Sequence, residues 1–315
     1  MRALVLKNRL NLVDDYPDPL PAVGECLVRV KLAGICGTDL ELARGYMDYS
    51  GVPGHEFVGT VASSRNQALV GMRVVGEINA ACGHCDACID GLERHCANRT
   101  VLGIVSRDGA FADYLTLPEP NLRALPESIP DEAAVFVEPM AAAYEILDQV
   151  PLKRTARILV LGDGRLGAMV ALVLKAEAYE PIVGGHHQDK LRRLTELGLK
   201  VYLEENLRSG YDVVVDCSGN SEGFNRALAL VSPRGTVVLK STAAAAAPLN
   251  LAPAVINEVT VIGSRCGRFE PALEAISSGK IDPCPLIDGT YEIGDYEAAF
   301  KAATSPSNFK ILLRM

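Results

Sequence analysis

The sequence has no excess of positive charge and no long apolar run, and these absences limit what it can bind. Lys and Arg number 31 against 39 Asp and Glu, so the formal net charge is −8. An acidic chain repels nucleic acids and anionic membranes, and we expect neither as a partner. The longest apolar stretches, such as AVFVEPMAAA at 134–143, are too short or too interrupted to span a bilayer. The first residues contain no signal-peptide core, so we expect a cytoplasmic protein.

Cysteine, by contrast, is concentrated in one place. Four of the nine cysteines follow the spacing C-x2-C-x2-C-x7-C, and they are Cys82, Cys85, Cys88 and Cys96. Cytoplasmic thiols stay reduced, so such a cluster favours a metal site over disulfides. Four thiolates complete a tetrahedral zinc shell without an open position, which predicts a structural zinc. The alternatives are unligated cysteines or a disulfide pair, and we interpret His84 and His95 inside the cluster as surface residues.

The hydrophobic pattern changes twice along the chain. Short alternating runs punctuated by Gly and Pro predict a mostly β region up to about residue 128. A helix follows, for which Ser128 is the expected N-terminal cap. From Arg157 apolar strands rich in Val and Ile alternate with helices, which predicts a doubly wound parallel sheet. The alanine run at 243–247 is expected to be a loop or the start of a helix.

These changes predict the division of the chain. We expect a first domain at 1–140, with the cysteine lobe at 80–97, and a dinucleotide-binding domain at 141–280. The segment 281–315 contains an expected loop, an amphipathic helix and a last strand that rejoins the first domain.

A glycine-rich turn lies at the start of the doubly wound region. Gly162, Gly164 and Gly167 form G-x-G-x-x-G, directly after an apolar strand and at the start of a helix. Glycine lets the backbone approach a pyrophosphate, and the helix N-terminus stabilises its negative charge. The turn, including Arg165 and Leu166, therefore predicts dinucleotide binding. The alternative is a tight strand-to-helix turn without a ligand.

The carboxylate that usually holds the adenosine ribose is absent from the end of the second strand. Gly185 occupies that position, followed by His186 and His187. Without a carboxylate a 2′-phosphate is not repelled, and the histidines with Lys190 or Arg192 could bind it. We therefore predict NADP(H) rather than NAD(H). The alternative is that the histidines are exposed loop residues and that NAD(H) binds.

Three separated pieces complete the set of motifs: AGICGTDLEL, VPGHEFVG and VFVEPMAA. Together with the cysteine cluster and the glycine turn, in this order, they resemble the zinc-dependent medium-chain alcohol dehydrogenases, over nearly the whole chain. Glu138 stands where the best-known members have a second cysteine, which is similar to the polyol, sorbitol and glucose dehydrogenase branch. The resemblance implies a GroES-like, mostly β catalytic domain plus a doubly wound Rossmann domain.

The resemblance also implies residue roles. A catalytic zinc would be held by Cys36, His55 and a carboxylate, either Glu56 or Glu138. Thr38 would accept the alcohol proton and Asp39 would orient a ligand. Glu41 stands where many relatives have a proton-relay histidine. Cys217 and Ser218, after Asp216 at a strand end, and Arg265 would contact the cofactor; the alternatives are a strand terminus and a surface arginine.

The function implied is hydride transfer between a polyol-like or sugar-like alcohol and NADP(H), with one catalytic and one structural zinc. One alternative is a reductase, or a dehydrogenase of a specialised biosynthetic intermediate, that uses NAD(H). Another is a nucleotide-binding or zinc-binding homologue without catalysis. Families of this kind are usually dimers or tetramers, so we expect a homo-oligomer.

Overall fold

The structure is a computed structural model, which describes residues 1–242 and 249–315. The alanine run at 243–247 lies outside the described residues. The chain divides into two compact units, one formed by Met1–Glu138 with Asp282–Met315 and the other by Pro139–Ile281. No helix among the described residues is long and apolar enough to cross a membrane.

The first unit is built around strand β3 (Glu25–Gly34). Its sequence ECLVRVKLAG alternates apolar with polar residues over most of its length, and burial largely follows the same alternation. The strand lies in a seven-stranded sheet of order β16-β17-β3-β4-β5-β9, in which β8 also pairs with β3. The other strands of this unit are β1 (Ala3–Leu6), β2 (Leu10–Val13), β4 (Glu56–Ser63), β5 (Arg73–Gly76), β6 (Asn79–Ala80), β7 (Thr100–Val101), β8 (Tyr114–Pro118), β9 (Leu122–Ala124), β16 (Ile287–Glu292) and β17 (Lys310–Arg314).

The end of the chain is part of this sheet. Strand β17 pairs antiparallel with β3, and Leu312 lies opposite Gly34. The helix α10 (Tyr296–Ala303) precedes β17, as the amphipathic pattern predicts. The segment before α10 differs from the prediction, because it forms strand β16 rather than a loop. Its pairing partner β17 lies about twenty residues further along the chain, so the local pattern alone does not reveal the strand.

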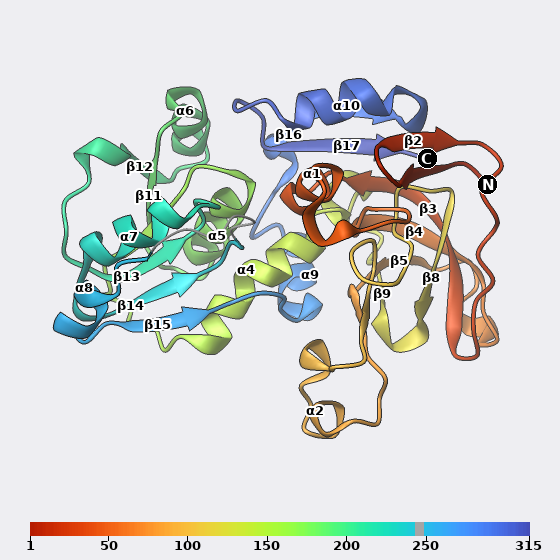
Figure 1. Ribbon diagram of the computed structural model, residues 1–315, viewed down its shortest axis with the longest axis horizontal. Helices are drawn as coiled ribbons and strands as arrows, with labels where there is room; N and C mark the ends of the chain where they lie inside the picture. Colours follow the sequence, from red (N-terminus) through yellow and green to blue (C-terminus); the bar gives the residue numbers. More distant parts are fainter. Residues whose placement is uncertain (243–248) are drawn as a thin grey trace. The chain divides into compact units, whose positions relative to one another are not determined.

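Two short helices of the first unit carry cysteines at their N-termini. Helix α1 (Gly37–Ala43) begins after Cys36, and helix α2 (Asp86–Ile89) begins after Cys85. The segment with α2 extends from the sheet as a separate lobe (Figure 1), whose base is the antiparallel pair β6 and β7. Little apolar surface is available there, since Ile89 is 74% exposed. The lobe therefore needs another source of stability.

The predicted helix after residue 128 forms two pieces, α3 (Asp131–Ala134) and α4 (Val137–Gln149). The expected cap at Ser128 is wrong, because the N-terminal flanking residue is Pro130. A residue that precedes proline is disfavoured in the helical region, so Ile129 cannot extend the helix back toward Ser128.

The second unit is a six-stranded parallel sheet of order β12-β11-β10-β13-β14-β15. This order, which reverses at β10, is that of a doubly wound sheet. The prediction of a mostly β region followed by a doubly wound sheet is confirmed. The elements are β10 (Ile158–Leu161), α5 (Arg165–Ala176), β11 (Ile182–Gly185), α6 (Gln188–Glu196), β12 (Lys200–Leu203), β13 (Tyr211–Asp216), α7 (Ser221–Leu230), β14 (Val231–Leu239), α8 (Ala252–Ile256), β15 (Thr260–Gly263) and α9 (Phe269–Ser277).

Local signals explain several boundaries of this unit. All four residues of β10 are buried, as the continuous apolar run ILVL predicts for a central parallel strand. Helix α6 ends next to Gly198, whose φ of +75° is the left-handed conformation that glycine adopts at no cost. Helix α7 begins at a side-chain cap, in which Asn220 Oδ1 accepts a hydrogen bond from the Gly223 amide at 2.8 Å.

Candidate metal and nucleotide sites

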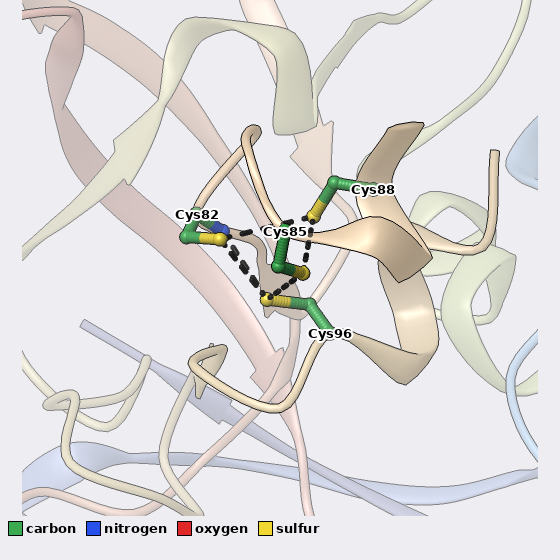
Figure 2. Close-up of side chains that lie close together, drawn as sticks. All are labelled: Cys82, Cys85, Cys88 and Cys96. Atoms are coloured by element: carbon green, nitrogen blue, oxygen red, sulfur yellow. Dashed lines mark hydrogen bonds between the residues drawn. The ribbon is translucent and has the colours of Figure 1, made fainter. Parts of the chain in front are cut away.

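The four clustered cysteines point their sulfur atoms toward one another. Figure 2 shows the four sulfur atoms facing a common centre. The Sγ atom of Cys85 lies 3.5 Å from that of Cys88 and 3.6 Å from that of Cys96. The Sγ atom of Cys82 lies 3.5 Å from that of Cys96 and 4.0 Å from that of Cys88. A tetrahedron with Zn–S bonds of about 2.3 Å has edges of about 3.8 Å, so these spacings fit four thiolates around one zinc ion.

The other interpretations of this cluster do not fit the geometry. A disulfide has an S–S distance of about 2.05 Å, and all nine cysteines are free. His84 and His95 are exposed, as expected, and neither belongs to the group of four ligand atoms. The carbonyl of Cys82 lies 2.8 Å from His84 Nδ1. The backbone amide of His84 is the largest factor that lowers the pKa of the Cys82 thiol, to about 6, whereas burial and the neighbouring thiols raise the pKa of Cys88 to about 12. A thiolate is the form that binds metal.

A second group of possible ligands gathers in the same unit from two separate stretches of the chain. Cys36 precedes α1, His55 lies in the loop before β4, and Glu56 is the first residue of β4. One ligand atom from each lies within 4.8 Å of the others. His55 is 3% exposed and Glu56 is 1% exposed. A thiolate, an imidazole and a carboxylate suit zinc, and three protein ligands leave a fourth position for a substrate.

Asp39 holds this group together. Its Oδ2 accepts a hydrogen bond from the backbone amide of Cys36 at 2.8 Å, and its Oδ1 accepts one from Gly54 at 3.2 Å. The same Oδ1 lies 3.3 Å from Nδ1 of His55. Asp39 is 1% exposed and therefore fixed in place by these contacts. Carboxylates in such positions orient metal-binding histidines, which is the role that the sequence predicts for Asp39.

The electrostatic environment of His55 is dominated by this carboxylate. Complete burial lowers the pKa of the imidazole, but the charges of Asp39 and then Cys36, with hydrogen bonds to both, offset burial and leave the pKa well above its usual value. Imidazole binds metal in its neutral form, so protons compete with the metal at this position.

Glu56 has a buried partner that sequence reasoning missed. Lys310 Nζ, at the start of β17, donates a hydrogen bond to Oε2 of Glu56, and both side chains are at most 3% exposed. A Cβ at Gly34 would lie 2.5 Å from the same oxygen, so glycine there leaves room for the carboxylate. The available signal was a lysine in the otherwise apolar run FKILL. Lysine is almost never fully buried unless it is paired.

The remaining candidate residues of this site differ in how they lie relative to the three converging ligands. The Thr38 hydroxyl lies 4.0 Å from Cys36 Sγ, next to the group. Glu41 forms an ion pair with Arg44 on the surface of α1, in which its Oε1 lies 2.6 Å from a guanidinium nitrogen of Arg44. Glu138, in the first turn of α4, is partly buried and is not among the three residues whose ligand atoms converge in the described chain.

The glycine turn forms a cradle in the second unit. A Cβ at Gly162 would lie 2.7 Å from the carbonyl oxygen of Cys217, and one at Gly167 would overlap the Gly162 carbonyl. A Cβ at Gly164, by contrast, would meet nothing within 4 Å, so the turn is open at the start of α5. Close backbone packing on one side and free space at a helix N-terminus on the other fit a bound pyrophosphate.

The other residues predicted to contact the cofactor differ in their exposure and in their hydrogen bonds. Ser218 is fixed by Asp216, which accepts hydrogen bonds from the Ser218 amide at 2.9 Å and the hydroxyl at 2.7 Å. Burial raises the pKa of the Cys217 thiol, so it is not a reactive group. Arg265 is exposed, and its carbonyl accepts a hydrogen bond from Lys240 at 2.6 Å. Arg165 and Leu166 are partly buried in the first turn of α5.

The end of the second strand is occupied by a carboxylate from the glycine turn itself. A side chain at Gly185 would overlap the carboxyl group of Asp163. Asp163 Oδ2 accepts a hydrogen bond from the amide of His187 at 2.7 Å, and its Oδ1 lies 2.9 Å from His187 Nδ1. His186 lies 2.9 Å from Glu204 Oε2. Lys190, a further candidate, is only 6% exposed.

Family models match both units of the chain. The alcohol dehydrogenase GroES-like domain matches residues 22–127, and the zinc-binding dehydrogenase model matches residues 166–278. The chain is 32% identical to an L-threonine 3-dehydrogenase of Streptomyces coelicolor, over 99% of both proteins. It is 27% identical to a sorbitol dehydrogenase of Halalkalibacterium halodurans, over 96% of this chain and 94% of the relative.

Solved structures have the same fold and bind either coenzyme. A short-chain alcohol dehydrogenase of E. coli CFT073, complexed with NADH, superposes with a TM-score of 0.92 at 27% identity, over 100% of this chain and 99% of that one. A zinc-binding dehydrogenase of Sinorhizobium meliloti 1021, bound to NADP, reaches a TM-score of 0.90 at 23% identity, over 100% and 99%. The GroES-like and Rossmann domains that the resemblance implied are thereby confirmed.

Proposed function

Because the chain belongs to the zinc-binding dehydrogenase family, whose members are zinc-dependent NAD(P) oxidoreductases of alcohols and polyols, we propose that it oxidises a polyol-like or sugar-like alcohol. The observation that carries the proposal is the convergence of Cys36 with the adjacent residues His55 and Glu56, within 4.8 Å. The first unit would then supply the catalytic zinc, and the second unit would bind the dinucleotide.

The residues near the metal group have separate tasks in this proposal. Zinc, when bound, supplies Lewis-acid polarisation of the alcohol oxygen, and NAD(P)⁺ accepts the hydride. The Thr38 hydroxyl is the first acceptor of the alcohol proton, since it lies beside Cys36. Asp39 keeps Cys36 and His55 in position. Glu41 is held by Arg44 and could receive a proton only after that pair opens.

The ligand set supports the proposed substrate class. A carboxylate in place of a second thiolate makes the metal site harder, and harder sites favour oxygen donors such as vicinal hydroxyls. A relative at 27% identity is a sorbitol dehydrogenase, whereas one at 32% identity is an L-threonine 3-dehydrogenase. Both names describe a substrate with a hydroxyl beside a second polar group, which could complete the open position of the metal.

The decisive experiment combines metal analysis with a substrate screen. We expect about two zinc ions per chain, one in each cysteine-containing group, and turnover with a member of a panel of polyols, aldoses, simple alcohols and L-threonine. The panel is measured in both directions with each coenzyme. Zinc binding without turnover of any alcohol or carbonyl compound would count against the proposal.

The identity of the third ligand can be tested separately, with Glu56→Gln and Glu138→Gln as a matched pair. Each change removes one carboxylate charge at nearly constant volume. In cobalt-substituted protein, loss of the true ligand alters the visible absorption of the catalytic site, and the other substitution leaves it intact. We expect the change for Glu56→Gln, because only Glu56 belongs to the converging group. The reverse result would assign the role to Glu138.

We propose, in addition, that the protein is a homo-oligomer. Strand β15 is at one edge of the six-stranded sheet, so its outer backbone groups lack a partner strand in the described chain. Val255 and Ile256 of α8, the helix that precedes β15 in sequence, are 77% and 78% exposed. Val261 on β15 itself is 41% exposed. An apolar edge of this kind is a protein–protein contact surface. Light scattering should give a mass of at least twice 33.6 kDa, and Val261→Lys should lower it.

A further inference from the structure

The second unit contains a pocket lined by charged side chains at the end of its second strand. The pocket has a volume of about 510 Å³ and is lined by Gly185, His186, Gln188, Leu203, Glu204, Glu205 and Arg226. In a doubly wound sheet the adenosine ribose binds at the end of the second strand, which is Gly185 of β11 here. The pocket therefore adjoins the place where a 2′-hydroxyl or a 2′-phosphate would lie.

The two histidines and the arginine at this place each already face a carboxylate. His187 Nδ1 lies 2.9 Å from Asp163 Oδ1, and His186 Nε2 lies 2.9 Å from Glu204 Oε2. Arg226 Nε lies 3.6 Å from the other oxygen of Glu204. A 2′-phosphate brings roughly two negative charges. It would have to displace one of these carboxylates from its partner and would also face the exposed Glu205.

Asp163 explains why the usual ribose carboxylate is missing from position 185. Its carboxyl group fills the space that a side chain at Gly185 would need. Both Asp163 oxygens are taken by His187, at 2.7 and 2.9 Å, and its side chain is 7% exposed. Asp163 is therefore a fixed support for the start of α6 and is not available to a ribose.

Glu204 is the carboxylate that remains available. It lies in the 3-10 turn Glu204–Asn206 directly after β12, the neighbour of β11 in the sheet. Arg226 fixes this turn by donating a hydrogen bond to the Glu204 carbonyl at 3.2 Å. The side-chain partner His186 is 72% exposed, and an exposed ion pair of this kind is weak. Ribose hydroxyls can therefore replace His186 at low cost, and each can donate to a carboxylate oxygen.

We propose that Glu204 acts as the ribose-binding carboxylate of this chain and gives it a preference for NAD(H) over NADP(H). The inference rests on the proposed dinucleotide binding of the second unit. It differs from the prediction made from the sequence, which considered only position 185 and the cationic residues after it. The two histidines among those residues face carboxylates from the glycine turn and from the turn after β12, which a local pattern does not reveal.

The test is equilibrium binding of NADH and NADPH to the zinc-loaded protein. Binding is measured by calorimetry and by coenzyme fluorescence. The chain has no tryptophan, so the fluorescence of the bound nicotinamide is measured without a tryptophan background. ADP-ribose and its 2′-phosphate serve as probes of the adenosine half alone. We expect NADH and ADP-ribose to bind at least about tenfold more tightly than their 2′-phosphorylated counterparts, the size of a lost hydrogen bond to a charged group.

The variant Glu204→Gln should reduce this preference about tenfold or more, mainly through weaker NADH binding and stronger NADPH binding. Glu196→Gln is the matched control, because it removes the same charge from an exposed residue of α6 that does not line the pocket; it should change the preference less than threefold. Melting curves confirm that both variants are folded. A second substitution, Glu204→Ala, should have the same direction of effect.

Different failures have different meanings. Equal or tighter binding of NADPH by the unmodified protein would overturn the inference and leave the proposed oxidoreductase function intact. An unchanged preference in Glu204→Gln, or an equal change in Glu196→Gln, would also overturn it. Absence of binding by both coenzymes would overturn the inference together with the proposed function.

Discussion

The four-cysteine lobe and the Cys36–His55–Glu56 group are two possible metal sites with opposite construction. In the lobe all the ligands lie within fifteen residues, and their sulfurs already have the spacing of a zinc tetrahedron. In the other group three different ligand types come from two stretches of the chain, at Cys36 and at 55–56, and the carboxylate of Glu56 is held by a lysine. Four identical ligands close a coordination shell, whereas three mixed ligands leave a position for chemistry.

The difference between the two sites should be largest in catalysis, which gives the first prediction. His55→Ala removes an imidazole ligand from the mixed site and should lower kcat/KM by about three orders of magnitude, because the Lewis-acid contribution to the barrier is several kcal/mol. The melting temperature should stay within a few degrees of the original. Steady-state kinetics and calorimetry measure the two effects, and zinc content should fall by about one equivalent. Substantial retained activity would remove the distinction between the sites.

The converse substitution tests the lobe. Cys85→Ser opens the four-sulfur shell and should destabilise the protein by roughly 3–5 kcal/mol, since structural zinc sites supply folding energy to segments without a core. Chemical denaturation measures the loss, and Cys284→Ser, at a cysteine outside both groups, is the control. Activity of the folded fraction should change little. An unaltered unfolding curve would argue that the lobe holds no metal.

A third prediction concerns the lysine that only the mixed site contains. Lys310→Met leaves Glu56 buried without its cation, so the metal-free protein should lose about 3 kcal/mol of stability. Bound zinc can compensate the unpaired carboxylate, so this loss should become smaller in the zinc-loaded protein and zinc should bind more tightly. Unfolding with and without zinc measures the difference, and Lys310→Arg, which keeps the charge, is the control. Equal losses of stability in the metal-free and the zinc-loaded protein would show that Lys310 does not act on the metal site.

The smallest expected effect is that of the orienting carboxylate. Asp39→Asn keeps the size of the side chain but removes the charge near His55, and it should weaken zinc binding at the mixed site about 10- to 100-fold. Competition with a chelator measures this affinity, and the lobe zinc in the same protein is an internal reference that should not change. If both ions were lost together, the effect would be one of overall folding.

The glycine turn and the end of the second strand show how far local reasoning extends. Gly162, Gly164 and Gly167 form the predicted cradle, because the motif depends on neighbours in sequence. The proposed coenzyme preference depends on side chains that meet there from three different segments. Asp163 was visible inside the motif, yet its position beside Gly185 follows only from the parallel pairing of β10 with β11.

The sequence by itself determined the fold class, the four-cysteine lobe and the glycine turn, because periodicity, short ligand spacing and backbone freedom are properties of adjacent residues. Tertiary structure alone decided which residues stand beside the candidate ligands. Lys310 meets Glu56 across 254 positions of the chain because β17 adds to β3, which pairs with β4. Glu204 reaches the pocket at β11 because β12 pairs with that strand. Burial then fixes the partners of each charge, since an unpaired charge in the interior is costly.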